Sequence, residues 1–403
     1  MNDNRNFRQT PTQNRAPRPA PRPVSVPKKR KRRAGLIPLI LILFVLLTIV
    51  LCALFLLRCK PKPDQNVPFS TEPQSTDGED RPTVSPGDTT YTRKDGVYNF
   101  LLAGMDHVGL NTDVMIVANY DVNAQKLSLI QFPRDTFFDE QKLNSRFQTH
   151  YLDKWSEDKD ERKSFGINGL KEDIEKTFCI KIDYTAVMDL SGFEKTVDAI
   201  GGVDMTVPFD MDYEDPVQDL YIHISKGYQN LNGKKAMQFI RFRNSYLEGD
   251  LGRTDAAKLF LSAFIKSFKA SINIKNISSV VSVVKDSLVI DISLSDLLYF
   301  AKNAIDLDLS SVSFMTLPGC DTREYKDSGR WFYIVKKNDA VKAVNTYLNV
   351  YDDDITTAIF DPSKNLYDPS KDGFAEIYDS PAGDLSVYTA SEIDQDGITI
   401  YRK

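Results

Sequence analysis

The sequence predicts an α/β domain whose mixed central β-sheet has helices on both faces, after one N-terminal transmembrane helix. Two observations indicate this fold class. Between residues 96 and 350, short apolar runs of strand length alternate with segments of helical spacing, as in domains whose sheet is covered by helices. Before this region, residues 34–57 contain no charged side chain. A plain cytoplasmic enzyme is therefore excluded.

The charge-free run has the length of a membrane span. Its 24 residues would extend roughly 36 Å as a helix, and a bilayer core is about 30 Å thick. A buried core helix and a cleavable signal peptide are the alternatives. Both fit less well, because the run has no polar stripe and is longer than the apolar region of a signal peptide. We expect an uncleaved anchor.

Charges are segregated around this run. The 403 residues contain 51 Lys and Arg against 56 Asp and Glu, so the formal net charge is −5. Residues 1–33 alone have eleven bases and one acid, which gives +10 there and −15 in the rest of the chain. Because the bases at 28–33 adjoin the span, the positive-inside rule places the N-terminus in the cytoplasm. We expect a single-pass type II protein of the cell membrane, with residues 58–403 outside the cell.

Composition divides the remainder of the chain. Residues 1–33 form a basic, Pro-rich cytoplasmic tail, and residues 58–95, with six prolines, form an extracellular linker. Residues 351–403 are acidic and rich in Asp, Ser, Pro and Gly, so we expect a partly disordered tail there. The folded domain is expected at 96–350.

The expected strands are short apolar runs that end in Gly, Pro or Asp. Three of them follow one another closely at the start of the domain. Strands are expected at 97–105, 113–121, 126–133, 181–189, 203–212 and 311–317, and the segment 236–243 fits either a helix or a strand. The apolar spacing of the intervening segments predicts helices at 167–179, 191–202, 254–268, 295–305 and 337–348. Ser191 and Thr254 are the candidate N-caps of two of these helices.

Two carboxylates lie on either side of the first loop of the domain. Asp106 ends the first expected strand and Asp113 opens the second. Together they could coordinate one hard divalent cation, and ligands that are all oxygens favour Mg²⁺, with Mn²⁺ as the alternative. A pair of ordinary turn residues is the other interpretation of this spacing.

Four arginines follow expected strands or begin a helix in this otherwise acidic domain. They are Arg134, Arg241, Arg243 and Arg253. A guanidinium matches phosphate oxygens in pairs, so such a cluster beside two carboxylates is the arrangement expected for a pyrophosphate. Surface ion pairs with the many acids are the alternative for any one arginine.

Other chemistries have little support in the sequence. The three histidines are scattered, so a His-based zinc site or a Ser-His-Asp triad lacks residues. The only basic segment is the 1–33 tail, which does not support nucleic-acid binding. Cys179 and Cys320 fit one disulfide or two buried thiols equally well.

A series of motifs resembles the LytR-CpsA-Psr family over about residues 97–350. The motifs are GMD at 104–106, TD at 112–113, FPRDT at 132–136, KLN at 142–144, DAIGGVDMTVPFDM at 198–211, KKAMQFIRFR at 234–243 and DLGR at 250–253. The order of tail, single span and extracellular domain is also similar. Several linked motifs in order are more specific than any one of them.

The resemblance implies a three-layer domain and a function. Family members look like Mg²⁺-dependent phosphotransferases of Gram-positive envelopes. They move a teichoic-acid or capsule type of anionic glycopolymer, with its phosphate, from undecaprenyl pyrophosphate to a peptidoglycan hydroxyl. The resemblance assigns magnesium to Asp106 and Asp113 and the pyrophosphate to Arg134, Arg241, Arg243 and Arg253. It implies that Asp135 and Asp250 orient neighbouring arginines, and it leaves a general base role open for either of them.

Two departures from the family pattern leave the activity open. The Arg-Ser-Asp-Thr loop is here Asn111 to Val114, and the glutamine four residues after Arg253 is Ala257. One cationic and one amide donor are therefore missing, and His107 or Lys142 are the candidate substitutes. A non-catalytic binder of polyprenyl pyrophosphate or wall glycan, and a pyrophosphate hydrolase, are the alternative functions.

Four phenylalanines have two interpretations. Phe137, Phe138, Phe178 and Phe193 are candidates for the wall of a lipid tunnel, and ordinary core packing is the alternative. The second is the expectation for each of them.

Overall fold

A computed structural model describes most of the chain after residue 90. The described residues are 60–63, 91–105, 110–216, 220–242, 250–273, 275–325, 329–356, 360, 374–378, 380–390 and 393. All of them belong to one compact unit, Phe55–Lys403. Within these residues, no helix combines the length and the apolar character that a membrane crossing needs. The expected span, 34–57, and the cytoplasmic tail lie outside the described residues.

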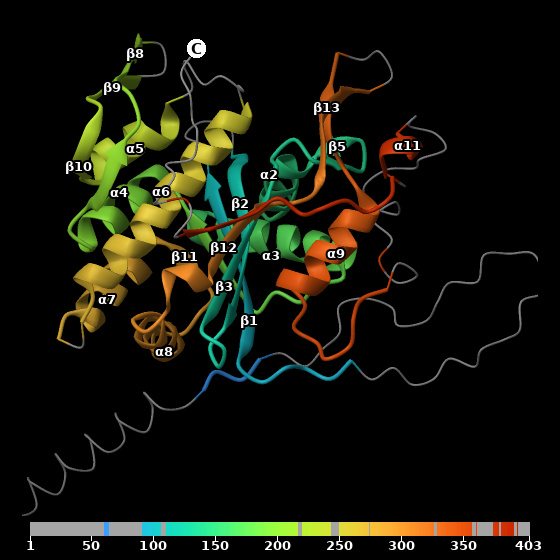
Figure 1. Ribbon diagram of the computed structural model, residues 1–403, viewed down its shortest axis with the longest axis horizontal. Coiled ribbons are helices and arrows are strands. Elements are labelled where there is room, and N and C mark those ends of the chain that lie inside the picture. Colours follow the sequence, from blue (N-terminus) through green and yellow to red (C-terminus); the bar gives the residue numbers. More distant parts are fainter. Residues whose placement is uncertain are drawn as a thin grey trace, which may run out of the picture. The chain divides into compact units, whose positions relative to one another are not determined.

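A seven-stranded mixed sheet runs through the domain (Figure 1). Across the sheet its strands are β11 (Val289–Ile290), β6 (Tyr184–Met188), β1 (Val97–Met105), β2 (Thr112–Asp121), β3 (Lys126–Phe132), β12 (Val312–Thr316) and β15 (Val387–Thr389). The order is mixed because β1, β2 and β3 form an antiparallel meander, whereas β6 and β12 pair with β1 and β3 in parallel. Parallel pairs need long crossovers, and the helices of the domain supply them.

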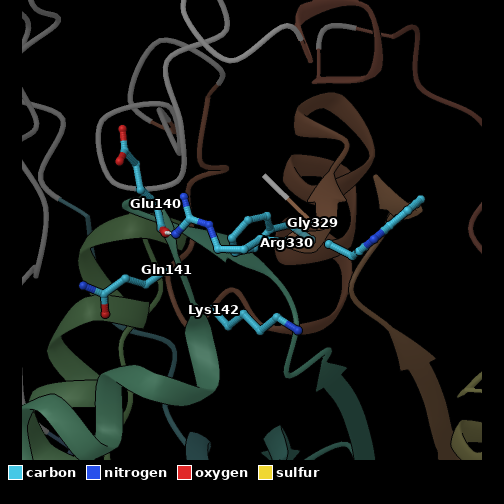
Figure 2. Close-up of a pocket in the computed structure, with 7 residues that line it drawn as sticks. Glu140, Gln141, Lys142, Gly329 and Arg330 are labelled. Carbon is cyan, nitrogen blue, oxygen red and sulfur yellow. Dashed lines mark hydrogen bonds between the residues drawn. The ribbon is translucent and has the colours of Figure 1, made fainter. Parts of the chain in front are cut away.

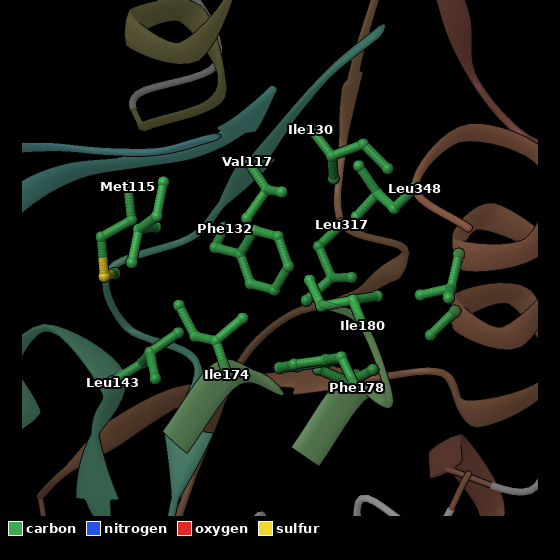
Figure 3. Close-up of a cluster of buried hydrophobic side chains, with 14 of the residues drawn as sticks. Met115, Val117, Ile130, Phe132, Leu143, Ile174, Phe178, Ile180, Leu317 and Leu348 are labelled. Atoms are coloured by element: carbon green, nitrogen blue, oxygen red, sulfur yellow. The ribbon is translucent and has the colours of Figure 1, made fainter. Parts of the chain in front are cut away.

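Helices cover both faces of this sheet, as predicted. The helices are α2 (Leu143–Asp153), α3 (Lys159–Phe178), α4 (Leu190–Ala199), α5 (Gly233–Arg241), α6 (Asp250–Ser271), α7 (Ile277–Ser287), α8 (Leu294–Ala304), α9 (Lys337–Tyr347) and α11 (Ala375–Tyr378). Alternate strand residues point to opposite faces. Val117 and Phe132 therefore meet α2 and α3 on one face (Figure 3), whereas Tyr98 meets Phe300 of α8 on the other, with ring centroids 4.9 Å apart.

A second apolar cluster lies beside the sheet, among α4, α5, α6, α7 and two ribbons. The ribbons are β7 (Val203–Val207) with β10 (Gly227–Leu231), and β8 (Met211–Asp215) with β9 (Leu220–Ile224). Val203, Leu231 and Phe239 are fully buried in this cluster. A single strand was expected at 203–212. Pro208 explains the break between β7 and β8, because proline cannot donate to a strand ladder.

Two short hairpins adjoin the α2 side of the sheet. They are β4 (Phe137–Phe138) with β5 (Gln141–Lys142), and β13 (Gly319–Glu324) with β14 (Trp331–Val335). The turn of the first consists of Asp139 and Glu140, both with positive φ (48° and 59°). Two successive positive φ values are typical of the tight turn that matches strand twist.

Several helix boundaries differ from the prediction, and α3 begins at Lys159 rather than at residue 167. Asp189, not Ser191, caps α4, because its carboxylate accepts a hydrogen bond from the Gly192 N–H at 2.9 Å. Helix α6 begins at Asp250, so Thr254 lies inside the helix and is not its cap. The ambiguous segment 236–243 belongs to α5 as far as Arg241. An extended strand presenting Arg241 and Arg243 on one face is therefore excluded.

Part of the expected C-terminal tail belongs to the fold. Strand β15 pairs with β12 at the edge of the sheet, and Phe360, Ala390 and Ile393 are buried. These three buried residues are too widely separated along the chain to give a periodic pattern, although each of them belongs to the core.

The phenylalanines and cysteines have plain structural roles. Phe137, Phe138 and Phe178 are buried in the core that contains α2 and α3, and Phe193 packs against Phe260 of α6. Core packing is thus the interpretation that the contacts support. No disulfide joins Cys179, which is buried, and Cys320, which is partly buried.

Candidate functional site

Arg134 lies at the centre of a cluster of charges in the loop after β3. Its Nη1 is 2.9 Å from Oδ1 of Asp113, and its Nε is 3.7 Å from Oδ1 of Asp135. The arginine side chain is 26% exposed, so the guanidinium is partly withdrawn from water but still within reach of a ligand. Partial burial strengthens such ion pairs relative to those on the open surface.

The backbone of β2 explains why Asp113 faces this arginine. Gly104 of β1 pairs with Val114, but the next residue, Met105, pairs with Thr112. Asp113 is therefore the extra residue of a β-bulge. Bulges redirect side chains and are common beside active sites. The bulge lies one residue before Asp106 in the partner strand, although Asp106 itself lies outside the described residues.

Hydrogen bonds fix the loop that presents Arg134. Thr136 closes it locally, since its Oγ1 donates to the Pro133 carbonyl at 2.7 Å. Asn144, in the first turn of α2, donates its N–H to the Arg134 carbonyl at 3.2 Å. Tyr333 of β14 donates its N–H to the Asp135 carbonyl at 2.8 Å. The loop is thus held by α2, which follows it in the chain, and by the distant strand β14. A preorganised arginine loses less conformational entropy when it binds an anion.

Lys142 joins the cluster from β5. Its Nζ is 2.8 Å from Oδ1 of Asp135, the carboxylate that also faces Arg134. Asp135 thus lies between two cations, with its side chain 16% exposed. Sequence reasoning named Lys142 as a candidate substitute donor for the missing arginine of the Asn111 loop, and the structure places it next to Arg134's own partner.

The other predicted site residues are only partly described. Asp106, His107 and Arg243 lie outside the described residues. Asp250 and Arg253 occupy the first turn of α6, but their side chains are not described. Arg241 is half-buried in the last turn of α5. The structure therefore brings together Arg134, Asp113 and Asp135, and it does not extend that constellation to the other arginines.

Asp113 is the one member of the expected metal pair that lies within the described residues. Within the described ranges no group of three or more His, Cys, Asp or Glu is placed to hold a metal ion. The donor type nevertheless fits Mg²⁺, because the groups beside Arg134 are carboxylates without thiol or imidazole.

The sequence gives no local signal for Tyr333 and Trp331 of β14 as neighbours of the site. They follow Arg134 by about two hundred residues, and long-range contacts such as the pairing of Thr136 with Tyr333 bring the strand there. Trp331 is half-exposed beside Lys142 in a surface hollow.

Arg134 thus lies between two carboxylates at the end of a β-meander, in an α/β domain with a mixed sheet. The model of the LytR_cpsA_psr family matches residues 68–349. The chain belongs to this family, as the order of its motifs predicts.

Relatives and solved structures agree with this membership. A Bacillus subtilis protein named polyisoprenyl-teichoic acid–peptidoglycan teichoic acid transferase TagV is 25% identical over 211 residues, 52% of this chain and 52% of that protein. The chain thus matches about half the length of this relative. A TagU transferase of the same designation from Oceanobacillus iheyensis is 24% identical over 268 residues, 64% of this chain and 76% of that protein. The crystal structure of B. subtilis TagV superposes with a TM-score of 0.52 at 22% identity, covering 63% of this chain and 96% of that one, which supports the fold.

Proposed function

We propose that this protein transfers an anionic glycopolymer of teichoic-acid or capsule type from an undecaprenyl pyrophosphate carrier to peptidoglycan. Family membership and the designations of the relatives support this function. The observation that carries the proposal is the geometry around Arg134, a half-buried guanidinium fixed between Asp113 and Asp135. Such a group can donate to non-bridging phosphate oxygens where negative charge develops.

The reaction follows from the roles of these groups. A peptidoglycan hydroxyl attacks the phosphorus that bears the glycopolymer, the bond to the carrier phosphate breaks, and undecaprenyl phosphate leaves. The glycopolymer keeps its phosphate as a phosphodiester to the acceptor. Arg134 stabilises charge on the transferring phosphoryl group, and Arg241, Arg243 and Arg253 bind the remaining pyrophosphate oxygens. The proton of the hydroxyl passes to a base, for which Asp135 and Asp250 are the candidates.

A divalent cation belongs to the proposal. Asp106 and Asp113 would hold Mg²⁺, which would neutralise charge on the pyrophosphate. The bulge that presents Asp113 beside the end of β1 supports this pairing, because Asp106 directly follows the last residue of that strand.

Membrane attachment is the remaining part of the proposal. Residues 34–57 anchor the chain, the basic tail stays in the cytoplasm, and the domain faces outward, where both carrier and acceptor are found. Protease added to intact cells should digest the domain and spare the tail, and protection of the domain would contradict the orientation.

One observation favours a second candidate, a non-catalytic binder. The position of the family's arginine is Asn111, and the described neighbours of Arg134 are acids. A hydrolase, with water as acceptor, is a third candidate.

Product analysis separates the three functions. The full-length protein would be incubated in liposomes with Mg²⁺, a lipid-pyrophosphate glycan and peptidoglycan. Transfer yields glycan joined to acceptor sugar by a phosphodiester, hydrolysis yields free glycan phosphate, and a binder yields neither product. The proposed function predicts the first outcome, and either of the others overturns it.

A further inference from the structure

A hollow adjoins the Arg134 site on the side of the short hairpins. It has a volume of about 400 Å³ and is formed by the β4–β5 turn on one side and the β13–β14 hairpin on the other. Figure 2 shows that Glu140, Gln141 and Lys142 of the first hairpin and Gly329 and Arg330 of the second line this hollow. The Gln141 side chain is directed away from Arg330, and its Oε1 accepts a hydrogen bond from Ser145 Oγ at 3.3 Å. Binding sites for small groups are concave, with aromatic surface and a few placed polar groups.

Trp331 provides the aromatic surface. Its side chain is 50% exposed, whereas the next residue, Phe332, is 1% exposed and fixes the strand in the core. An indole held at half exposure on an anchored strand offers a flat apolar face without a conformational cost. The C–H face of a pyranose ring is the kind of surface that covers such an indole, while the hydroxyls of the ring point outward to polar groups.

Arg330 provides a fixed polar group. Its Nη1 donates to the Glu140 carbonyl at 3.0 Å, and its guanidinium lies 5.3 Å from the ring centroid of Tyr325 and 5.7 Å from that of Phe332. Tyr325 in turn donates its hydroxyl to the Glu140 carboxylate at 3.2 Å. The two hairpins are thus joined through ordered side chains, so the hollow is preformed rather than created by a ligand.

The charges of the hollow suit an uncharged sugar. Lys142 is paired with Asp135. The other two charged residues of the lining, Glu140 and Arg330, have opposite signs, so these four side chains together have no net charge. A polymer with a phosphate in each repeat would need an excess of cations. The hollow therefore favours the acceptor glycan over the anionic donor.

Two contacts also connect the hollow to the Arg134 site. Lys142 lines the hollow and contacts Asp135. Tyr333, two residues after Trp331, donates its N–H to the Asp135 carbonyl. A sugar on Trp331 is therefore held beside the loop that presents the phosphoryl-binding arginine.

We propose that this hollow, with Trp331 as its stacking surface and Arg330 as its polar partner, binds a sugar ring of the peptidoglycan acceptor. This inference rests on the proposed transfer function, because it gives that reaction an acceptor subsite. It positions an acceptor hydroxyl for attack and so acts by proximity.

Trp331 and Trp155 are the two tryptophans of the chain, which makes a direct binding test possible. In the full-length Trp155→Phe variant, all indole emission comes from Trp331. Soluble, uncrosslinked peptidoglycan glycan strands should change that emission in a saturable way, whereas lipid-free donor glycan should not. No change with peptidoglycan strands, or a change with donor glycan alone, overturns the inference. Because this measurement needs no turnover, its outcome is independent of whether transfer occurs.

A kinetic test connects the hollow to the reaction. Trp331→Ala should raise KM for peptidoglycan about tenfold, with KM for the lipid-linked donor unchanged, as expected when uniform acceptor binding is lost. Trp331→Tyr keeps a ring and should restore most of the affinity. Trp155→Ala, at a side chain that is 86% exposed, is the matched control. An unchanged acceptor KM in Trp331→Ala overturns the inference, while inactive wild-type protein overturns the transfer function itself.

Discussion

Arg134 and Asp113 form an ion pair with 2.9 Å between Nη1 and Oδ1, although 21 residues separate them in the chain. The β2–β3 ladder explains the contact. Its last pair is Met115 with Phe132, so Asp113 and Arg134 each lie two residues beyond it. An antiparallel meander thus places an anion and a cation at one end of the sheet, and the bulge at Asp113 turns the carboxylate towards the arginine.

Removing the charge of Asp113 tests the proposed metal site. We expect Asp113→Asn to raise the Mg²⁺ concentration needed for half-maximal transfer about tenfold or more, since an amide is a poorer ligand for a hard cation. The measurement is transfer rate against Mg²⁺ concentration. Asp121→Asn, at the opposite end of the same strand, is the control. Equal Mg²⁺ requirements in the two variants would refute the assignment of Asp113 as a ligand.

Substitution of Phe178 distinguishes a core position from a position in the wall of a lipid tunnel. It is fully buried and lies 5.0 Å from Phe132, ring centroid to centroid, in an edge-to-face arrangement. Phe178→Ala should lower the free energy of unfolding by about 3–5 kcal/mol, because it leaves a cavity. Phe165→Ala, on the same helix but 44% exposed, should cost far less. Unfolding in urea measures the free energy of unfolding of both variants. Unchanged stability with weakened lipid binding would instead support a tunnel wall.

The raised pKa of Tyr120 predicts that the protein loses stability in alkaline solution. Burial raises the pKa of Tyr120 to about 12, against a slight lowering by its hydrogen bond with Gln125. An unfolded tyrosine has a pKa of about 10, so the phenol stabilises the fold below pH 10 and this contribution is lost as the pH rises through the folded pKa. Tyr120→Phe should lose less stability than wild type between those two values. The measurement is the unfolding midpoint against pH.

Tyr228→Phe is the control for this experiment, since that side chain is 75% exposed. If Tyr120→Phe and the wild type lose stability in parallel as the pH rises, the phenol of Tyr120 is not the source of the effect.

The sequence predicted the strands around the site well and the surrounding elements less well. Expected strands at 97–105 and 126–133 correspond to β1 and β3 within a residue, because both are short runs rich in apolar residues and end at Asp or Pro. Helix α6 begins earlier than expected, at Asp250, because the polar DLGR segment has no apolar period. Strand β15 has only three residues, and its pairing with β12 is a tertiary event that no local pattern encodes.

The candidate site was likewise predictable only in part. Asp113 and Arg134 stand at ends of adjacent strands, so their proximity follows from the hairpin. The contribution of β14 does not follow from any neighbouring sequence, because Tyr333 reaches the loop only through the fold. The sequence located the charged residues and the structure showed which aromatic strand supports them.

Substitution of Arg134 in the transfer assay tests the central claim most directly. The full-length wild type, Arg134→Ala and Arg134→Lys would be compared for glycan joined to peptidoglycan, with Arg162→Ala as a guanidinium control that stacks on Tyr151 instead. We predict that Arg134→Ala lowers the rate about 10²–10³-fold and that Arg134→Lys recovers only part of it, because lysine lacks the paired donors. Turnover by Arg134→Ala equal to wild type would contradict the account.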